Sequence, residues 1–186
     1  RWSEGDFVII SERGILLLEI KGGRVAYKNN LWEFTDRDGK TTKKIEGPGA
    51  QANSAFHSLD KNYLQDKFED DLKGVAMGFG VVFESISRVV SNNLSDLPEL
   101  PDIITAYKKN CSDSKTFKSY LNKLYSHYET KVNARKKLLS EELINSIVKR
   151  LRPEFEKVPA IGYQIDDLEN QMLSFTEEQY KVYDSI

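Results

Sequence analysis

The feature that most constrains the fold is an aliphatic run near the N-terminus that ends in two charged residues. Residues 15–18 are Ile-Leu-Leu-Leu, Glu19 and Lys21 follow them, and glycines flank the segment. An uninterrupted apolar run of this kind is typical of a central strand that is buried on both faces of a sheet. Because side chains alternate along a strand, Glu19 and Lys21 are expected to point to the same side. The segment therefore predicts a buried strand with two charged groups at its end.

Turn signals and hydrophobic spacing predict further strands and helices around this strand. The predicted strands are 7–10, 15–21, 24–28, 31–35, 40–45 and 74–83. The predicted helices are one that begins at Pro48, and then 102–109, 114–132, 140–151 and 176–186. Strands that dominate the first half and helices that dominate the second predict an α/β chain with a helical C-terminal part.

Composition predicts a soluble globular chain with a moderate core. The 186 residues are 39% hydrophobic and 30% charged. The longest uncharged apolar stretch, 74–83, is too short to cross a bilayer, which takes about 20 helical residues. The single cysteine, Cys111, excludes an intrachain disulfide and a cysteine zinc site, and it favours a reducing, cytoplasmic compartment. His57 and His127 are too far apart in the sequence to form a compact histidine metal motif.

Basic residues are concentrated between Lys108 and Lys137, a segment with nine Lys and Arg and only two acids. Such a segment either faces a polyanion or forms solvated helix faces, and charge alone does not decide between these interpretations. The candidate contacts to nucleic acid are Lys131, Arg135, Lys136 and Lys137.

The strongest candidate for chemistry is the pair Asp6 and Glu19, which stand on two strands that we expect to pair. Two carboxylates at adjacent strand ends can share a divalent cation, and Mg²⁺ binds oxygen ligands while it retains several waters. The backbone carbonyl of Ile20 is a third candidate ligand. Lys21 is suited to position a metal-bound water and to stabilise charge on a phosphoryl group, which metal-assisted phosphodiester hydrolysis requires. The alternatives are structural: a Glu19–Lys21 ion pair of little energetic weight, and an Asp6 that only caps a turn.

Five parts of the sequence form a recognisable series. They are EGDFVI at 4–9, GILLLEIKG at 14–22, Trp32, PGAQA at 48–52 and GFGVVF at 78–83. The series resembles the PD-(D/E)XK nucleases, and more narrowly the nuclease-related domain (NERD) family. The resemblance implies a restriction-endonuclease-like mixed β-sheet core flanked by helices. It also implies that Asp6 and Glu19 bind Mg²⁺ or Mn²⁺, that Lys21 serves catalysis, and that Gln51 lies beside the active site on the following helix.

Two departures from the family pattern keep a second interpretation open. Related nucleases often carry an acid on a helix before the first strand, and the sequence begins too late to show one. Ala55 stands four residues after Gln51, where a tyrosine is frequent. The alternative is therefore a catalytically inactive module with the nuclease fold, which binds nucleic acid or acts as a scaffold for a helicase.

The C-terminal segment 173–186, LSFTEEQYKVYDSI, resembles the Q motif that opens superfamily 1 helicases. The resemblance implies that Gln179 reads adenine, since a side-chain amide both donates and accepts hydrogen bonds. No Gly-x-x-x-x-Gly-Lys-[Ser/Thr] phosphate-binding loop occurs in the sequence, so ATP is expected only in a helicase domain farther along. A generic capped amphipathic helix is the alternative.

Together these features predict three parts and one leading function. Residues 1–110 are expected to form the nuclease-related core, 111–158 a helical extension, and 159–186 a linker with the first helix of a truncated helicase. The expected function is metal-dependent cleavage of DNA within a nuclease–helicase protein, in phage defence or DNA repair. RNA as a substrate and a homodimer are left open, and no membrane association is expected.

Overall fold

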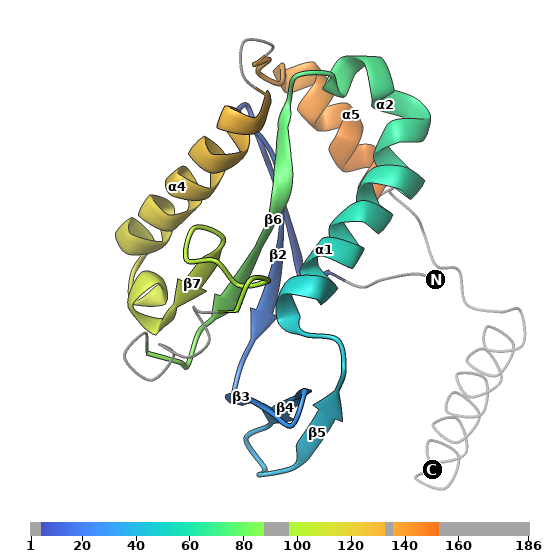
Figure 1. Cartoon of the computed structure of the whole chain (residues 1–186). Coiled ribbons are helices and arrows are strands. Elements are labelled where there is room, and N and C mark those ends of the chain that lie inside the picture. The colour runs from blue at the N-terminus through green and yellow to red at the C-terminus, as the bar shows by residue number, and fades with distance from the viewer. Residues whose placement is uncertain (1–4, 88–96, 133–135, 153–186) are drawn as a thin grey trace, which may run out of the picture. The chain divides into compact units, whose positions relative to one another are not determined.

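The core of the molecule is a mixed four-stranded sheet in the order β1-β2-β6-β7 (Figure 1). The computed structural model describes residues 5–87, 97–132 and 136–152. Strand β1 (Phe7–Ser11) pairs antiparallel with β2 (Gly14–Lys21), whereas β6 (Ala76–Phe83) runs parallel to β2 and β7 (Thr105–Tyr107) runs parallel to β6. The predicted α/β fold with a mixed sheet is thus confirmed, and the finer restriction-endonuclease-like assignment stays a prediction.

Strand β2 is buried because the sheet flanks it on both sides and helices cover both faces. Its residues 14–19 are all buried, as the aliphatic run predicted. Gly14 begins the strand with a φ of +144°, and a Cβ there would lie 1.9 Å from the Ala76 carbonyl oxygen. The hairpin turn before β2 therefore needs glycine, both for its backbone angle and for the close approach of β6.

Helices from two parts of the sequence cover one face of the sheet. Helix α1 (Pro48–Leu59) continues through a π-helical turn, η1 (Asp60–Leu64), into α2 (Gln65–Leu72), and α5 (Glu141–Leu151) packs beside them (Figure 1). Pro48 stands in the first turn of α1, where proline has no hydrogen bond to lose. Ile15 and Leu17 of β2 pack against Ala55 of α1 in this part of the core.

Helix α4 (Ser114–Val132) covers the opposite face and sits unusually close to β6 (Figure 1). Its tyrosines reach the strand because β6 carries glycine beneath them: a Cβ on Gly78 would lie 2.1 Å from the Tyr128 ring. The Tyr128 hydroxyl then donates to the Phe79 carbonyl oxygen at 2.8 Å. Likewise, the Tyr120 hydroxyl donates to the Ile104 carbonyl oxygen at 2.9 Å. The segment expected as a separate helical extension thus contains α4 and α5, which share hydrophobic cores with the sheet.

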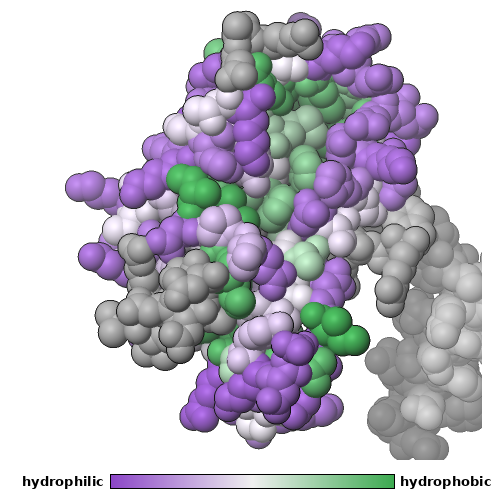
Figure 2. All heavy atoms as spheres, viewed as in Figure 1, coloured by the Kyte–Doolittle hydropathy of each residue, from purple (hydrophilic) through white to green (hydrophobic). Residues whose placement is uncertain are grey.

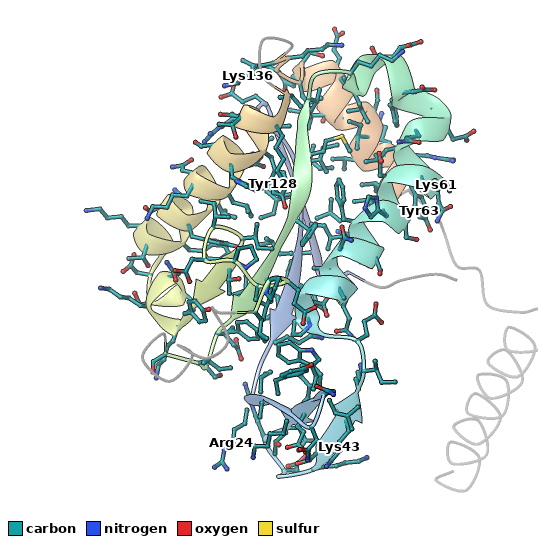
Figure 3. The ribbon with its side chains drawn as sticks, in the orientation of Figure 1. Arg24, Lys43, Lys61, Tyr63, Tyr128 and Lys136 are labelled. Carbon is teal, nitrogen blue, oxygen red and sulfur yellow. The ribbon has the colours of Figure 1, made fainter. Side chains whose placement is uncertain are left out.

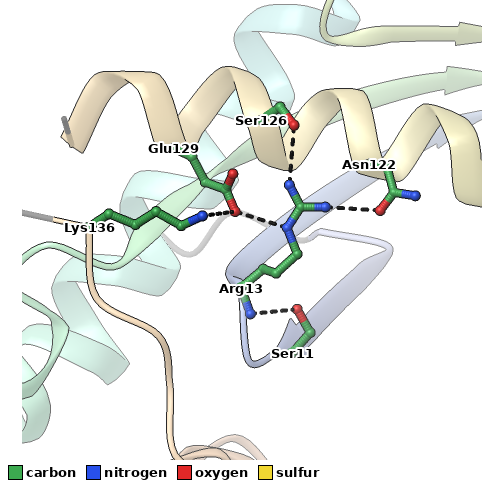
Figure 4. Close-up of polar contacts among 6 residues, drawn as sticks. All are labelled: Ser11, Arg13, Asn122, Ser126, Glu129 and Lys136. Atoms are coloured by element: carbon green, nitrogen blue, oxygen red, sulfur yellow. Dashed lines mark hydrogen bonds and ion pairs between the residues drawn. The ribbon is translucent and has the colours of Figure 1, made fainter. Parts of the chain in front are cut away.

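Arg13, in the β1–β2 turn, fastens the hairpin to α4 (Figure 4). Its guanidinium donates to Glu129 at 2.9 Å, to Asn122 at 2.9 Å and to Ser126 at 3.2 Å. The same group lies 5.0 Å from the centroid of the Tyr125 ring. A planar guanidinium suits this arrangement because its donors point in several fixed directions at once.

A second, smaller sheet follows β2 and extends beyond its C-terminal end (Figure 1). It consists of β3 (Arg24–Lys28), β4 (Leu31–Thr35) and β5 (Thr41–Lys44), all antiparallel. Asn29 and Asn30 form the β3–β4 turn with positive φ angles of 51° and 60°, as a tight hairpin requires. Trp32 is buried against α1 and β6, so it joins this sheet to the core.

The prediction of a helix over 102–109 is wrong. Residues 105–107 form β7 beside β6, and Lys108–Cys111 form a short 3₁₀ helix, η2. All three residues of β7 are buried, so pairing with β6 outweighs the local helical preference. The helix expected over 176–186 lies outside the described residues. Among the helices that the structure describes, none is long and apolar enough to span a membrane.

The close approach of α4 to β6 makes Gly78 a sensitive position. We expect Gly78→Ala to lower the free energy of unfolding by about 1–3 kcal/mol, because the added methyl group overlaps the Tyr128 ring. In a Tyr128→Ala background the same change is expected to cost much less, since the ring is gone. Urea unfolding of the wild type, both single variants and the double variant measures this coupling. An equal cost of Gly78→Ala in both backgrounds would contradict the packing described for this helix.

Candidate active site

The β1–β2 hairpin brings Asp6 beside the charged end of β2. Phe7 pairs with Leu18, so Asp6, one residue earlier, lies opposite Glu19. The Asp6 Oδ2 atom accepts a hydrogen bond from the Ile20 backbone N–H at 2.6 Å. The two predicted carboxylates, 13 positions apart in the sequence, therefore meet at one edge of the sheet.

Glu19 and Lys21 share one face of β2 and form an ion pair. The Lys21 Nζ atom lies 2.6 Å from Glu19 Oε1, and the side chains are 18% and 8% exposed. Lys21 Nζ also lies 5.3 Å from the centroid of the Phe34 ring, and Lys44 Nζ lies 5.9 Å from the same ring. This ion pair is largely shielded from water.

Burial raises the pKa of Glu19 above the ordinary value of a glutamate. The hydrogen bond and positive charge of Lys21 oppose this shift, and the negative charge of Asp6 adds to it. The pKa of Glu19 therefore stays raised although a lysine is in contact with it. A further positive charge near the carboxylate would favour its ionised form.

Two oxygen atoms are buried here without a hydrogen bond from any described residue: Glu19 Oε2 and Gln51 Oε1. An unsatisfied buried acceptor costs about 1–3 kcal/mol, so such atoms call for a donor or a cation. Glu19 Oε1 is already paired with Lys21, which leaves Oε2 as the free ligand atom. The N–H of Ile20 points toward Asp6, and in a strand the carbonyl of the same residue points to that side too. The oxygen atoms of Asp6, Glu19 and Ile20 thus suit a hard divalent cation.

Gln51 lies in the first turn of α1, on the same side of the sheet as Glu19. The next residue, Ala52, packs against Val81, and Val81 is the partner of Glu19 in the β2–β6 register. This packing sets the beginning of α1 at the level of Glu19. An acidic side chain also lies at the start of this helix: the Glu99 carboxylate accepts a hydrogen bond from the Ala50 backbone N–H at 3.3 Å.

Asp6 and Glu19 are the two carboxylates that the β1–β2 register brings opposite each other. Within residues 5–87, 97–132 and 136–152, no three His, Cys, Asp or Glu side chains gather as a metal-binding group. Two carboxylates are compatible with Mg²⁺, because this ion usually keeps several waters and binds through one or two carboxylates.

The small sheet extends beyond this end of β2. Arg24 and Lys43 mark its position, at the opposite end of the molecule from Lys136 (Figure 3).

Sequence reasoning missed the contribution of the small sheet to the site. Lys21 and Lys44 both lie near its Phe34 ring, and the charge of Lys44 opposes the rise in the pKa of Glu19. No local signal marks these residues, because β3, β4 and β5 must first pair before Lys44 comes near β2. The sequence contained one relevant signal, the hairpin pattern with Asn29-Asn30 at its turn, which indicates the small sheet but not its contact with β2.

Of the four basic residues expected to contact nucleic acid, the three that the structure describes are not brought to this site. Lys131 lies 4.6 Å from the Tyr128 ring centroid, and Lys136 Nζ lies 3.3 Å from Glu129. Lys137 donates to the Asp71 carbonyl oxygen at 2.8 Å, near the opposite end of the sheet from Glu19. Arg135 and Gln179, the candidate adenine-reading residue, lie outside the described residues. The proposed roles of these five residues stay predictions.

Comparisons of the chain with protein-family models, curated proteins and solved structures gave no match. The class that the fold and site define is therefore an α/β domain with a buried, lysine-paired carboxylate at the edge of a mixed sheet.

The raised pKa of Glu19 gives the expected metal binding a dependence on pH. We expect Mn²⁺ affinity to fall as the pH is lowered through the pKa of Glu19, because a proton then competes with the metal ion. Lys21→Met removes the group that favours the ionised carboxylate, so the loss is expected at a higher pH in this variant. Isothermal titration calorimetry with Mn²⁺, in buffers that span this pH range, measures the affinity of the wild type and of the Lys21→Met variant. Lys40→Met, in an exposed turn, is the control. An affinity independent of pH, or no difference between the two lysine variants, would contradict the assignment.

Proposed function

We propose that this chain is a metal-dependent nuclease domain that hydrolyses phosphodiester bonds of DNA. The observation that carries the proposal is the buried Glu19 carboxylate, which has one oxygen on Lys21 and the other without a hydrogen bond from the described residues. Asp6 beside it supplies the second carboxylate. Mg²⁺ or Mn²⁺ is the cofactor that this donor set favours.

The residues of the site have distinct tasks in this proposal. Asp6 and Glu19 would hold the cation, with the Ile20 carbonyl as a further ligand. When bound, such an ion supplies an acidified water and polarises a phosphoryl oxygen. Lys21 keeps a positive charge beside the carboxylate, where it stabilises the negative charge that develops on a phosphoryl group. Gln51 offers a buried amide oxygen at the same level of the sheet.

The resemblance to the PD-(D/E)XK and NERD nucleases supports the proposal and extends it. It implies a nuclease–helicase protein that acts in phage defence or DNA repair, with ATP used by a helicase domain. The residues leave RNA open as a substrate, since both nucleic acids present the same phosphodiester. Cytoplasmic location and a homodimer belong to the same proposal.

The second candidate function is a catalytically inactive module that binds nucleic acid or holds a helicase. One observation favours it: Lys21 already pairs with one oxygen of Glu19 at 2.6 Å, and burial raises the pKa of the carboxylate. A site that is closed by its own ion pair has less need of a metal ion. The two candidates differ in cleavage and in metal binding, which the same set of variants measures.

Cleavage of labelled single- and double-stranded DNA with Mg²⁺ or Mn²⁺ tests the proposal. We expect Asp6→Asn, Glu19→Gln and Lys21→Met each to lower the cleavage rate by about 100-fold or more, the usual scale for loss of a catalytic group. Asp38→Asn and Lys40→Met, in the exposed β4–β5 turn, make the same changes of charge away from the site. These controls are expected to cleave as the wild type does.

Cleavage that survives all three site substitutions would contradict the nuclease assignment. A wild-type chain that neither cleaves DNA nor binds Mn²⁺ would favour the inactive module. Circular dichroism of each variant, together with its unfolding midpoint in urea, separates loss of chemistry from loss of fold.

A further inference from the structure

A shallow hollow of about 900 Å³ runs along the outer face of α4. This helix covers the face of the sheet opposite α1, so the hollow lies across the sheet from Glu19 and Gln51 (Figure 1). Hydrophilic side chains dominate the surface over α4 (Figure 2). The described residues that line the hollow include three lysines, Lys115, Lys118 and Lys123, and no Asp or Glu.

These three lysines are available to a partner in a way that other lysines of the segment are not. Lys136 pairs with Glu129, and Lys137 is held by Asp71. By contrast, Lys115, Lys118 and Lys123 have no ion pair with any residue that the structure describes. The most concentrated free positive charge of α4 is therefore on its outer face.

The hydrogen-bonding groups beside the lysines are oriented as donors. Arg13 donates to the Asn122 Oδ1 and Ser126 Oγ atoms, which uses acceptor positions of both side chains (Figure 4). The amide hydrogens of Asn122 and the hydroxyl hydrogen of Ser126 remain able to donate outward. A surface of ammonium, amide and hydroxyl donors matches an acceptor-rich anion.

The spacing and the polarity of the hollow favour an extended anion. Lys115 and Lys123 are eight residues apart, which is about 12 Å along a helix axis at 1.5 Å per residue. This span covers several phosphates of a nucleic-acid strand, which follow each other at about 3.4 Å along the axis. Ile103 is the only large apolar side chain in the described lining, whereas a membrane-bound helix needs a broad apolar face.

We propose that the outer face of α4 binds the phosphate backbone of nucleic acid through Lys115, Lys118 and Lys123. Asn122 and Ser126 add neutral donors to the same backbone, the kind of contact that positions a protein without reading sequence. The surface holds a stretch of nucleic acid away from the Asp6–Glu19 edge. It goes beyond the proposed function, because it requires neither a bound metal ion nor cleavage.

Fluorescence anisotropy with a labelled DNA duplex and with a single strand, in EDTA, tests this surface in the full chain. Replacing the three lysines by glutamate is expected to weaken binding by about 30-fold or more at moderate salt. The slope of log affinity against log salt is expected to become shallower by about 2 to 3, since each neutralised phosphate contributes about 0.9. The milder change of all three lysines to glutamine is expected to act in the same direction and guards against a folding defect.

The matched control replaces Lys61, Lys67 and Lys149 by glutamate. These lysines are exposed on η1, α2 and α5, and their replacement changes the net charge by the same amount. The control is expected to weaken binding by less than about 3-fold, because the charge lies on the other side of the sheet. Equal losses in both triple variants would overturn the proposal, since net charge alone would then explain them. An absence of nucleic-acid binding together with binding of polyglutamate would also overturn it, in favour of an acidic protein partner.

The Glu19→Gln variant separates this surface from the nuclease proposal. It is expected to bind DNA in EDTA as the wild type does, while any cleavage is lost. A chain that never cleaves DNA but loses binding in the α4 variant would refute the proposed function and support the α4 surface. A chain that cleaves DNA, and binds it equally well with or without the three lysines, would support the proposed function and refute the α4 surface.

Discussion

The burial of a charged strand end is the constraint on which the rest of the structure depends. Strand β2 is covered on both faces, yet Glu19, two residues before its end, has only 6% of its surface exposed. Removal of a carboxylate from water costs several kcal/mol unless a cation or donors compensate. Lys21 provides part of this compensation at 2.6 Å, and it can do so because alternate residues of a strand share a face. The sheet thus stabilises the buried charge through a neighbour in its own strand.

The surrounding elements keep this strand end in a defined place. Arg13 fixes the β1–β2 turn to α4 at the far end of the hairpin, so the register that sets Asp6 opposite Glu19 is held from both ends. The small sheet places the Phe34 ring near Lys21, and Lys44 lies near the same ring. A position that is held by packing, and yet leaves a buried carboxylate oxygen without a donor among the described residues, is typical of a functional site.

Much of the fold could be predicted from local patterns, because most of its elements have strong periodicity and clear turns. The strands 7–10, 15–21, 24–28 and 31–35 match β1 to β4 closely, and 114–132 matches α4. Strand β7 could not be predicted, since its three residues are held by a parallel neighbour from a distant part of the sequence. A short segment of this kind has no periodicity of its own, and only the tertiary pairing decides its conformation.

The candidate site could be predicted only in part, because some of its residues are positioned by local structure and others by distant strand pairing. Asp6, Glu19 and Lys21 meet because one hairpin and one strand determine their positions, and both are local. Lys44 could not be predicted beside Glu19, since it arrives through three strands of a second sheet. The charge pattern of 108–137 indicated a basic segment but not which lysines are free. Their availability depends on partners such as Glu129 and Asp71, which only the folded chain brings near.

The central claim is that the free oxygen of Glu19 and the carboxylate of Asp6 bind one divalent cation. The most direct measurement is anomalous X-ray scattering from crystals of the chain soaked in Mn²⁺, with Glu19→Ala crystals treated in the same way. The account predicts one manganese peak within coordination distance of Glu19 Oε2 and an Asp6 oxygen, and its loss in the variant. The absence of a manganese peak at this edge in the wild type, or a peak that persists when Glu19 is replaced, would contradict this claim.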